Sequence, residues 1–365
     1  MTTRLIILDR DGTLIHEPAN ELIDTIAKYR LLPGVAEHLP SLRADDVQFV
    51  LATNQDGLGT TQYPQSAFDA VQTAFLNDLE KVGVTFMRQC ICPHIATDAC
   101  TCRKPHTQLF DALIIDPQID WPNSIVIGDR STDVQLAHAL GAQAMQVSTN
   151  LADEKTFAVV AEKIHAIMQT PRRAARMCRQ TKETAVHAAL HLDGTGVGIV
   201  KTGLGFFDHM LTALLHHASI DHWIVARGDL HVDEHHTVED VAIVLGGTLH
   251  AALQAGAGIQ RFGFLLPMDD SLAEVAIDLG GRPYSVFNAK FQRERVGDLP
   301  TELVSHFFYT LAMHLRANVH CTLRYSDNDH HAIEALFKAC GRALRMACEV
   351  DARHPTRIAS TKGVL

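Results

Sequence analysis

Two copies of a His-His-x-x-Glu pattern are the clearest chemical signal in this 365-residue chain. A further histidine precedes each copy, and residues three or four apart share one face of a helix, so each glutamate can point with histidines toward an ion. A single pair of adjacent histidines lies as readily on a helix surface, but the repetition favours metal binding. The candidate ligands are His209, His235, His236, Glu239, His306, His330, His331 and Glu334.

Divided equally, this set gives each of two ions three imidazoles and one carboxylate, which leaves open positions for substrate or water. Mixed imidazole and carboxylate ligation suits Mn²⁺, Fe²⁺ or Zn²⁺. We therefore expect two Mn²⁺ or similar divalent ions, and the sequence leaves open which ligands bind which ion. The pair His216-His217 is not repeated, and we interpret it as structural.

An acidic motif follows the apolar run Leu5–Leu8 in the first half of the chain. Asp9 and Asp11 could supply the nucleophile and the acid/base of phosphoryl transfer through an aspartyl-phosphate. Asp9, the Asp11 backbone carbonyl and Asp129 could hold Mg²⁺. Alone, the motif could be only an acidic turn, but further suitable groups follow later strands: Thr53, Asn54, Lys104 and Asp133.

Three cysteines and a histidine lie close together shortly before Lys104, at Cys92, His94, Cys100 and Cys102. Together they provide a tetrahedral set of ligands for a structural Zn²⁺ ion. Bound zinc would order the segment that presents Lys104. The alternative is a group of free cysteines beside a surface histidine.

The composition describes an ordinary globular protein, with 47% hydrophobic and 20% charged residues. A net charge of −10 argues against nucleic-acid binding. We expect no membrane span, since no apolar run approaches the required ~20 residues. The scattered cysteines and the absence of a recognisable signal peptide favour the cytoplasm.

The two halves of the chain predict two domains. Strand-like runs at Leu5–Leu8, Phe49–Ala52 and Ile125–Ile127 alternate with helical stretches, which indicates an α/β domain with a parallel, doubly wound sheet over residues 1–168. The basic residues 169–176 are the predicted linker.

Residues 177–365 mix strands and helices as an α+β domain. A shift of about 95 residues superposes the two histidine patterns and the helices around them, which indicates two duplicated units. The expected helices are 206–217, 235–255, 301–316 and 330–349, and the expected strands are Ala185–Leu192, His222–Ala226, Val275–Leu279 and Val319–Tyr325.

The first-half motifs resemble those of the haloacid dehalogenase-like phosphatases, in the same order: Asp9–Thr13, Thr53-Asn54, Arg103–Pro105 and Gly128–Asp133. The resemblance implies that Asp9 is the nucleophile and Asp11 the general acid/base. Thr53 and Lys104 would hold the phosphoryl group, and Asn54 would contact the substrate. Histidinol-phosphate phosphatases and heptose bisphosphate phosphatases share the cysteine loop, so the loop does not separate these two groups.

The second half resembles imidazoleglycerol-phosphate dehydratases through the segments Thr202–Leu211, Gly228–His231, His235–Asp240, Arg261–Phe264, Gly281–Pro283, Asn328–His331 and Ser360–Leu365. The resemblance implies that Glu183 contacts the substrate, and we expect it to move protons. It also implies binding of the substrate, chiefly its phosphate, by Arg261, Arg282, Ser360 and Lys362. Thr361 stands where many members have a second serine.

Joined, the halves resemble the bifunctional histidine-biosynthesis family, which links a histidinol-phosphatase to an imidazoleglycerol-phosphate dehydratase. The resemblance implies small phosphorylated substrates and a homo-oligomer, possibly large. The dehydratase half is what favours histidinol phosphate over a heptose bisphosphate or a broad set of phosphate esters. A metal-storage or metal-sensing protein is the alternative from another class.

Overall fold

The computed structural model describes residues 2–18, 22–148, 156–169, 173–253, 257–263 and 266–360. The chain divides into two compact units, Met1–Pro171 and Arg172–Leu365. Among the described helices, none has both the length and the apolar character needed to cross a membrane.

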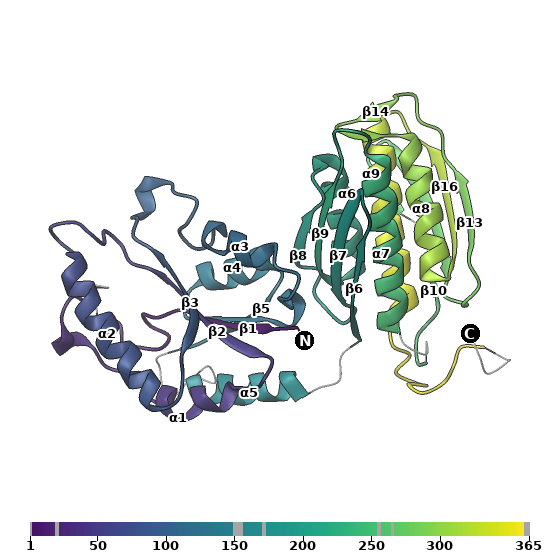
Figure 1. Ribbon diagram of the computed structural model, residues 1–365. Coiled ribbons are helices and arrows are strands. Elements are labelled where there is room, and N and C mark those ends of the chain that lie inside the picture. Colours follow the sequence, from purple (N-terminus) through teal and green to yellow (C-terminus); the bar gives the residue numbers. More distant parts are fainter. Residues whose placement is uncertain are drawn as a thin grey trace. The chain divides into compact units, whose positions relative to one another are not determined.

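The first unit is built on a parallel sheet with the strand order β3-β2-β1-β4-β5 (Figure 1). This confirms the predicted parallel sheet. The apolar strands are almost continuously buried, which explains why they read as unbroken apolar runs. The strands are β1 (Arg4–Leu8), β2 (Val47–Asn54), β3 (Phe86–Cys92), β4 (Ile125–Gly128) and β5 (Gln143–Gln146).

Helices pack on this sheet through apolar faces. In α2 the buried side chains of Phe68, Val71, Phe75 and Leu79 recur every three or four residues and so form one stripe. The helices are α1 (Val35–His38), α2 (Gln65–Lys81), α3 (Asp111–Ile114), α4 (Ser131–Leu140) and α5 (Phe157–Gln169). Short 3-10 helices span Ile26–Lys28, Leu39–Leu42, Ala96–Asp98, Gln108–Phe110 and Trp121–Asn123.

The second unit contains two sheets with α-helices between them (Figure 1). One has the order β6-β7-β9-β8, formed by β6 (Ala174–Gln180), β7 (Thr184–His191), β8 (Gly198–Lys201) and β9 (Asp221–Gly228). The other has the order β10-β12-β16-β13, with β11 paired to β12. Its strands are β10 (Phe262–Gly263), β11 (Leu266–Met268), β12 (Ser271–Asp278), β13 (Tyr284–Asn288) and β16 (Asn318–Tyr325), and a small hairpin joins β14 (Arg295–Val296) to β15 (Leu299–Pro300).

Close helix pairs form the centre of this unit: α6 (Gly205–Ala218) packs on α9 (Asp329–Cys348), and α7 (His235–Leu253) on α8 (Glu302–Leu315). A glycine permits the approach in each pair. A Cβ atom on Gly341 would lie 2.2 Å from Leu214 O, and one on Gly246 would lie 2.9 Å from Leu311 O. These separations leave no room for a larger residue, so the glycines set how closely the helices approach.

Part of the predicted linker is strand. Ala174, Ala175 and Arg176 begin β6, where Ala175 pairs with Leu190 of β7. Alternate side chains of β6 face the helices, as the closeness of Met177 to Gly247 indicates. The basic residues around this start obscured the short alternating pattern in the sequence. Residues 170–172 lie outside the described residues.

A buried histidine in β9 predicts pH-dependent stability of the second unit. His222 is 0% exposed, its Nδ1 lies 2.9 Å from Ile220 O, and its Nε2 has no hydrogen-bond partner within the part of the chain that the structure describes. Burial lowers its pKa from 6.5 to about 4. Between these two pKa values His222 is protonated in the unfolded chain but neutral in the folded chain. The free energy of unfolding therefore falls as the pH falls, by up to about 1.4 kcal/mol per pH unit.

Denaturant unfolding of the native protein and of His222→Gln from pH 7 to pH 4 would check this. The variant should show a shallower loss of stability across that window. A His314→Gln control, at an exposed position in α8, should keep the native slope. Equal slopes for the native protein and His222→Gln would contradict the prediction.

Candidate metal centres and active sites

The carboxyl ends of β1 and β4 bring three carboxylates around one ammonium group in the first unit. Lys104 Nζ lies 2.7 Å from Asp9 Oδ1 and 2.6 Å from Asp133 Oδ1. The ammonium also donates to Ala52 O at 3.0 Å. Asp9, Asp129 and Asp133 offer oxygens that lie within 4.8 Å of one another. The expected nucleophile and the expected phosphate-binding lysine are therefore in direct contact.

The charges of this cluster are unbalanced without a bound cation. Burial raises the pKa of Asp9 to about 8, although Lys104 opposes the shift. Burial also raises the pKa of Asp129, and the neighbouring charge of Asp133 adds to that effect. Three carboxylates share one ammonium, so a divalent cation would restore neutrality and keep Asp9 ionised. Carboxylate oxygens are the ligands that Mg²⁺ prefers, so the residues fit this ion.

The Asp11 side chain lies outside this carboxylate cluster. Arg10 donates to both of its oxygens, at 2.8 Å and 3.1 Å, and Gln55 donates to one of them at 2.7 Å. Sequence reasoning missed Arg10 and Gln55, and it named Asp133 only as a further carboxylate. The Gly128-Asp129-x-x-Thr132-Asp133 spacing, one turn into α4, was the signal available for Asp133.

Thr53 and Asn54 end β2 beside this cluster but make different contacts. Thr53 is buried, and its Oγ1 accepts a hydrogen bond from Gln55 Nε2 at 2.8 Å. Asn54 Oδ1 accepts from the backbone N–H of Lys104 at 3.0 Å. In this structure Asn54 therefore holds the loop that carries the lysine.

The four predicted zinc ligands converge. Cys92 Sγ lies 3.3 Å from Cys102 Sγ and 3.7 Å from Cys100 Sγ, and His94 Nδ1 lies 3.2 Å from Cys102 Sγ. A tetrahedral ion with Zn–S bonds of about 2.3 Å requires ligand atoms about 3.7 Å apart, so the donor atoms fit zinc with only a slight expansion. Arg103 closes the loop by ion pairing with Asp56 and by donating to His94 O at 3.0 Å.

In the second unit the histidine and glutamate side chains form two clusters, each drawn from both copies of the pattern. His235 and Glu239 of α7 meet His306 of α8, whose Nε2 lies 3.4 Å from Glu239 Oε1. That nitrogen is buried and forms no hydrogen bond with any described residue, as expected for an atom that binds a metal.

The second cluster joins His330 and Glu334 of α9 to His209 of α6. His209 Nε2 lies 3.6 Å from Glu334 Oε1, and His330 Nε2 lies 3.5 Å from Glu334 Oε2. Lys338 Nζ pairs with Glu334 at 2.8 Å, and although burial opposes it, this contact lowers the pKa of Glu334. The histidine upstream of each pattern thus lies in the cluster formed by the other pattern.

The remaining two predicted ligands lie outside both clusters. His236 Nδ1 lies 3.2 Å from Asp229, and His331 Nδ1 lies 2.6 Å from Asp270. The hydrogen bond that each ring donates to its carboxylate raises the pKa of the histidine. A carboxylate on Nδ1 fixes the ring and leaves Nε2 to bind a metal, as is common at metal sites. Sequence reasoning missed Asp229 and Asp270, which do not correspond under the repeat.

The predicted substrate contacts are only partly brought together. Arg261 pairs with Asp278 at 2.5 Å and donates to Ala359 O at 2.8 Å, beside Ser360. Glu183 is exposed, and its charge contributes, after Asp229, to the raised pKa of His236. Arg282 is exposed, and the position of Lys362 lies outside the described residues.

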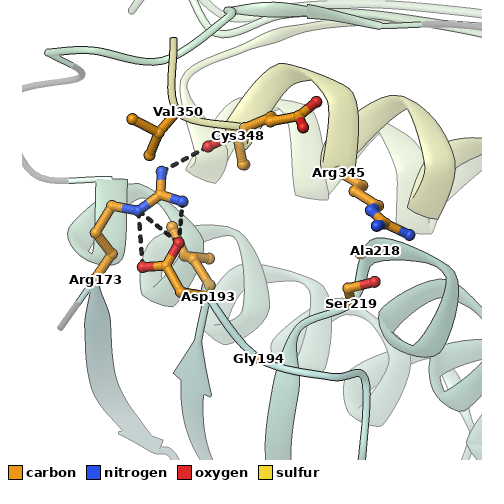
Figure 2. Close-up of a pocket in the computed structure, with 10 residues that line it drawn as sticks. Arg173, Asp193, Gly194, Ala218, Ser219, Arg345, Cys348 and Val350 are labelled. Atoms are coloured by element: carbon orange, nitrogen blue, oxygen red, sulfur yellow. Dashed lines mark hydrogen bonds and ion pairs between the residues drawn. The ribbon is translucent and has the colours of Figure 1, made fainter. Parts of the chain in front are cut away.

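A pocket of about 340 Å³ lies at the opposite ends of α6 and α9, away from His209 and His330. Figure 2 shows Arg173 there, bound to Asp193 and to Cys348 O, the latter at 2.6 Å. None of the predicted site residues lines this pocket. The arginine ties the start of β6 to the end of α9.

In comparisons with known families, one family model matches each half of the chain. Residues 202–344 match the model of imidazoleglycerol-phosphate dehydratase. Residues 101–170 match a HAD-hydrolase-like model. The matched ranges contain the second-unit clusters and the segment from Cys102 through Asp133, respectively.

Relatives match over the full length. The chain is 45% identical to the histidine biosynthesis bifunctional protein HisB of Actinobacillus pleuropneumoniae, with 100% of both chains covered. The crystal structure of imidazoleglycerol-phosphate dehydratase from Staphylococcus aureus matches with a TM-score of 0.45 and 36% identity, covering 48% of this chain and 99% of that one. The D,D-heptose 1,7-bisphosphate phosphatase of B. bronchiseptica matches with a TM-score of 0.39 and 27% identity, covering 45% and 99%.

The geometry of the cysteine loop predicts that Cys102→Ser weakens zinc binding by more than about 100-fold, since changes outside the ligand shell alone cost 10–100-fold. Metal analysis of the purified variant should show the zinc lost. Cys90→Ala is the matched control, because Cys90 is buried outside the cluster and contacts Leu109 O instead. Equal zinc content in both variants would refute this site.

Proposed function

The chain belongs to the family of bifunctional histidine-biosynthesis proteins, and from this membership we propose which residues carry each of its two activities. It is an enzyme with imidazoleglycerol-phosphate dehydratase and histidinol-phosphatase activities. The observation that carries our assignment is the separation of two kinds of site. Buried carboxylates surround a lysine in one unit, and paired histidine clusters lie in the other. A metal-storage protein would need only the second.

In the phosphatase unit, Asp9 is the nucleophile that takes the phosphoryl group, and Asp11 exchanges protons with the leaving group and with water. Lys104, from its position beside Asp9, holds the phosphoryl oxygens together with Thr53. Phosphatases of this class use Mg²⁺, which when bound supplies charge neutralisation and orients the phosphate. Asp9, Asp129 and Asp133 would hold it, with the Asp11 carbonyl as expected from the sequence.

We assign Zn²⁺ to the cysteine loop, where it would fix the segment that leads into Lys104. Histidinol phosphate is the substrate of this unit, and how broadly it accepts other phosphate esters is a separate property that a substrate panel would measure. The free thiols and the biosynthetic role support a cytoplasmic location.

In the dehydratase unit, two divalent ions, Mn²⁺ or similar, would occupy the two clusters. Bound there, they would supply Lewis-acid stabilisation of charge on the substrate's imidazole ring. Glu183, near His236, would move the proton at the glycerol carbon. Arg261, Arg282, Ser360 and Lys362 would bind the substrate phosphate. The contact between Arg261 and Ala359 supports a phosphate site that includes the C-terminal segment.

We propose that the active dehydratase is a homo-oligomer in which His236 and His331 complete the clusters of neighbouring copies. Each internal cluster contains two histidines and one glutamate. An equal division of the eight predicted ligands between two ions would give each ion one more histidine. Asp229 and Asp270 hold the remaining imidazoles away from the clusters of their own chain. These rings are partly exposed, so a second copy of the chain could reach them.

We also propose that this unit is an internal duplication. Each half has an antiparallel pair of long strands (β7 with β9, β12 with β16) and a parallel neighbour (β8, β13), and each half contributes a helix to each close pair. The helices α6 and α8 correspond, as do α7 and α9. This arrangement supports the repeat inferred from the sequence.

Asp9→Asn should reduce histidinol phosphate hydrolysis by about 10³-fold or more, because it removes the nucleophile. The dehydratase activity of the same preparation should remain and serves as the control for folding. Phosphate release and dehydration are measured separately. Normal phosphate release by the variant would overturn the assignment of Asp9.

His235→Ala should lower the bound divalent ion content and the dehydratase turnover together, since the ring is one of three donors in its cluster. His217→Ala is the matched control, from a histidine pair outside both clusters. Metal analysis, turnover and sedimentation velocity are the measurements. A full metal content combined with lost turnover would contradict the ligand assignment.

A further inference from the structure

Arg10 separates the two functional aspartates in sequence, yet its side chain is 0% exposed. Its Nε donates to Asp11 Oδ1 at 2.8 Å and its second guanidinium nitrogen donates to Asp11 Oδ2 at 3.1 Å. Such a two-point contact fixes the plane of a carboxylate as well as its position. The guanidinium is itself held by Gln72 at 2.9 Å and lies 5.0 Å from the ring centroid of Phe68.

Gln55 completes the enclosure of Asp11. Its Nε2 donates to Asp11 Oδ2 at 2.7 Å and to Thr53 Oγ1 at 2.8 Å. Its Oε1 accepts from Arg10 at 2.7 Å and from the Tyr63 hydroxyl at 2.9 Å. The amide therefore uses both its N–H groups and both its lone pairs, which leaves it one orientation.

The contacts are unequal on the two oxygens of Asp11. Among the described residues, Oδ2 accepts from Arg10 and Gln55, whereas Oδ1 accepts only from Arg10 Nε. Each carboxylate oxygen has two lone-pair positions, so Oδ1 keeps one for a proton. The surroundings thus select the oxygen that exchanges protons.

We propose that Arg10 and Gln55 are positioning residues, which act through Asp11 and present its Oδ1 to the leaving oxygen and then to water. The proposal rests on the proposed function of Asp9 and Asp11. In the first step Asp9 attacks phosphorus, the ester P–O bond breaks, and the Asp11 carboxyl proton passes to the departing alkoxide. In the second step Asp11 takes a proton from water as that water attacks the aspartyl-phosphate, which releases phosphate and restores Asp9.

The proposal predicts that the loss of phosphatase activity on changing Arg10 or Gln55 depends on the leaving group of the substrate. Histidinol leaves as an alkoxide and requires a proton, whereas p-nitrophenolate is a stable anion that leaves without one. Misplacing Asp11 should therefore slow cleavage of the alkyl ester far more than cleavage of the aryl ester. A defect in phosphate binding or in folding would slow both equally.

The test compares Gln55→Met, which keeps the side chain's length but removes its hydrogen bonds, with the native full-length protein. For histidinol phosphate kcat/KM should fall about 10- to 100-fold, part of the 10²–10⁴ that general acid–base catalysis contributes. For p-nitrophenyl phosphate kcat/KM should stay within about threefold, since it reports only steps through leaving-group departure. Slower attack by water should then appear as a pre-steady-state burst of nitrophenolate.

Arg10→Lys, which keeps the charge but not the two-point contact, should show the same selectivity. Gln65→Met is the matched control, because Gln65 is exposed and bonds only Asp69 in the described structure. Dehydratase activity reports folding in each sample. Equal losses on both esters, or no loss on either in Gln55→Met, would overturn the proposal. If Asp9→Asn still cleaves histidinol phosphate, the proposed function itself fails, so the two failures are distinguishable.

Discussion

Clusters of side-chain oxygen and nitrogen atoms that the protein only partly compensates are the constraint on which both sites depend. In the first unit three carboxylates share the charge of Lys104, and burial raises the pKa of Asp9 to about 8. In the described part of the second unit, the buried Nε2 of His306 forms no hydrogen bond. Such arrangements are costly unless a cation completes them. Both units therefore hold their reactive groups in arrangements that a bound cation would stabilise.

Packed elements maintain these arrangements against mutual repulsion. Asp9 follows a strand buried in the middle of a parallel sheet, and Asn54 accepts a hydrogen bond from the backbone N–H of Lys104, whose ammonium contacts Asp9. In the other unit the contacts at Gly246 and Gly341 set the separation of the helix pairs, and with it the positions of His306 and His209. The donor atoms can approach closely because the backbones carrying them are already held by apolar packing.

The sequence predicted the parallel sheet and all four long helices described in the second unit, because buried strands and amphipathic helices follow simple periodicities. It also placed Asp9 and Asp129 at one edge of the sheet, since both follow strands there, but it named Asp133 only as a further carboxylate. It could not assign His209 to the cluster of Glu334, because that depends on which helices pack together. The sequence also could not predict the roles of four single polar residues, Asp229, Asp270, Arg10 and Gln55. Their partners are distant in the sequence, or their orientation depends on packing.

The exchange of histidines between the two halves of the second unit has a consequence for its origin. Neither half supplies a complete ligand cluster, since His209 lies in the cluster of Glu334 and His306 lies in the cluster of Glu239. Under the proposed duplication, an isolated ancestral half would have bound an ion with comparable ligands only by pairing with an identical molecule. Fusion of two such genes would have turned a concentration-dependent encounter into a permanent one, and would have allowed the two halves to diverge, which would account for the unrelated carboxylates Asp229 and Asp270.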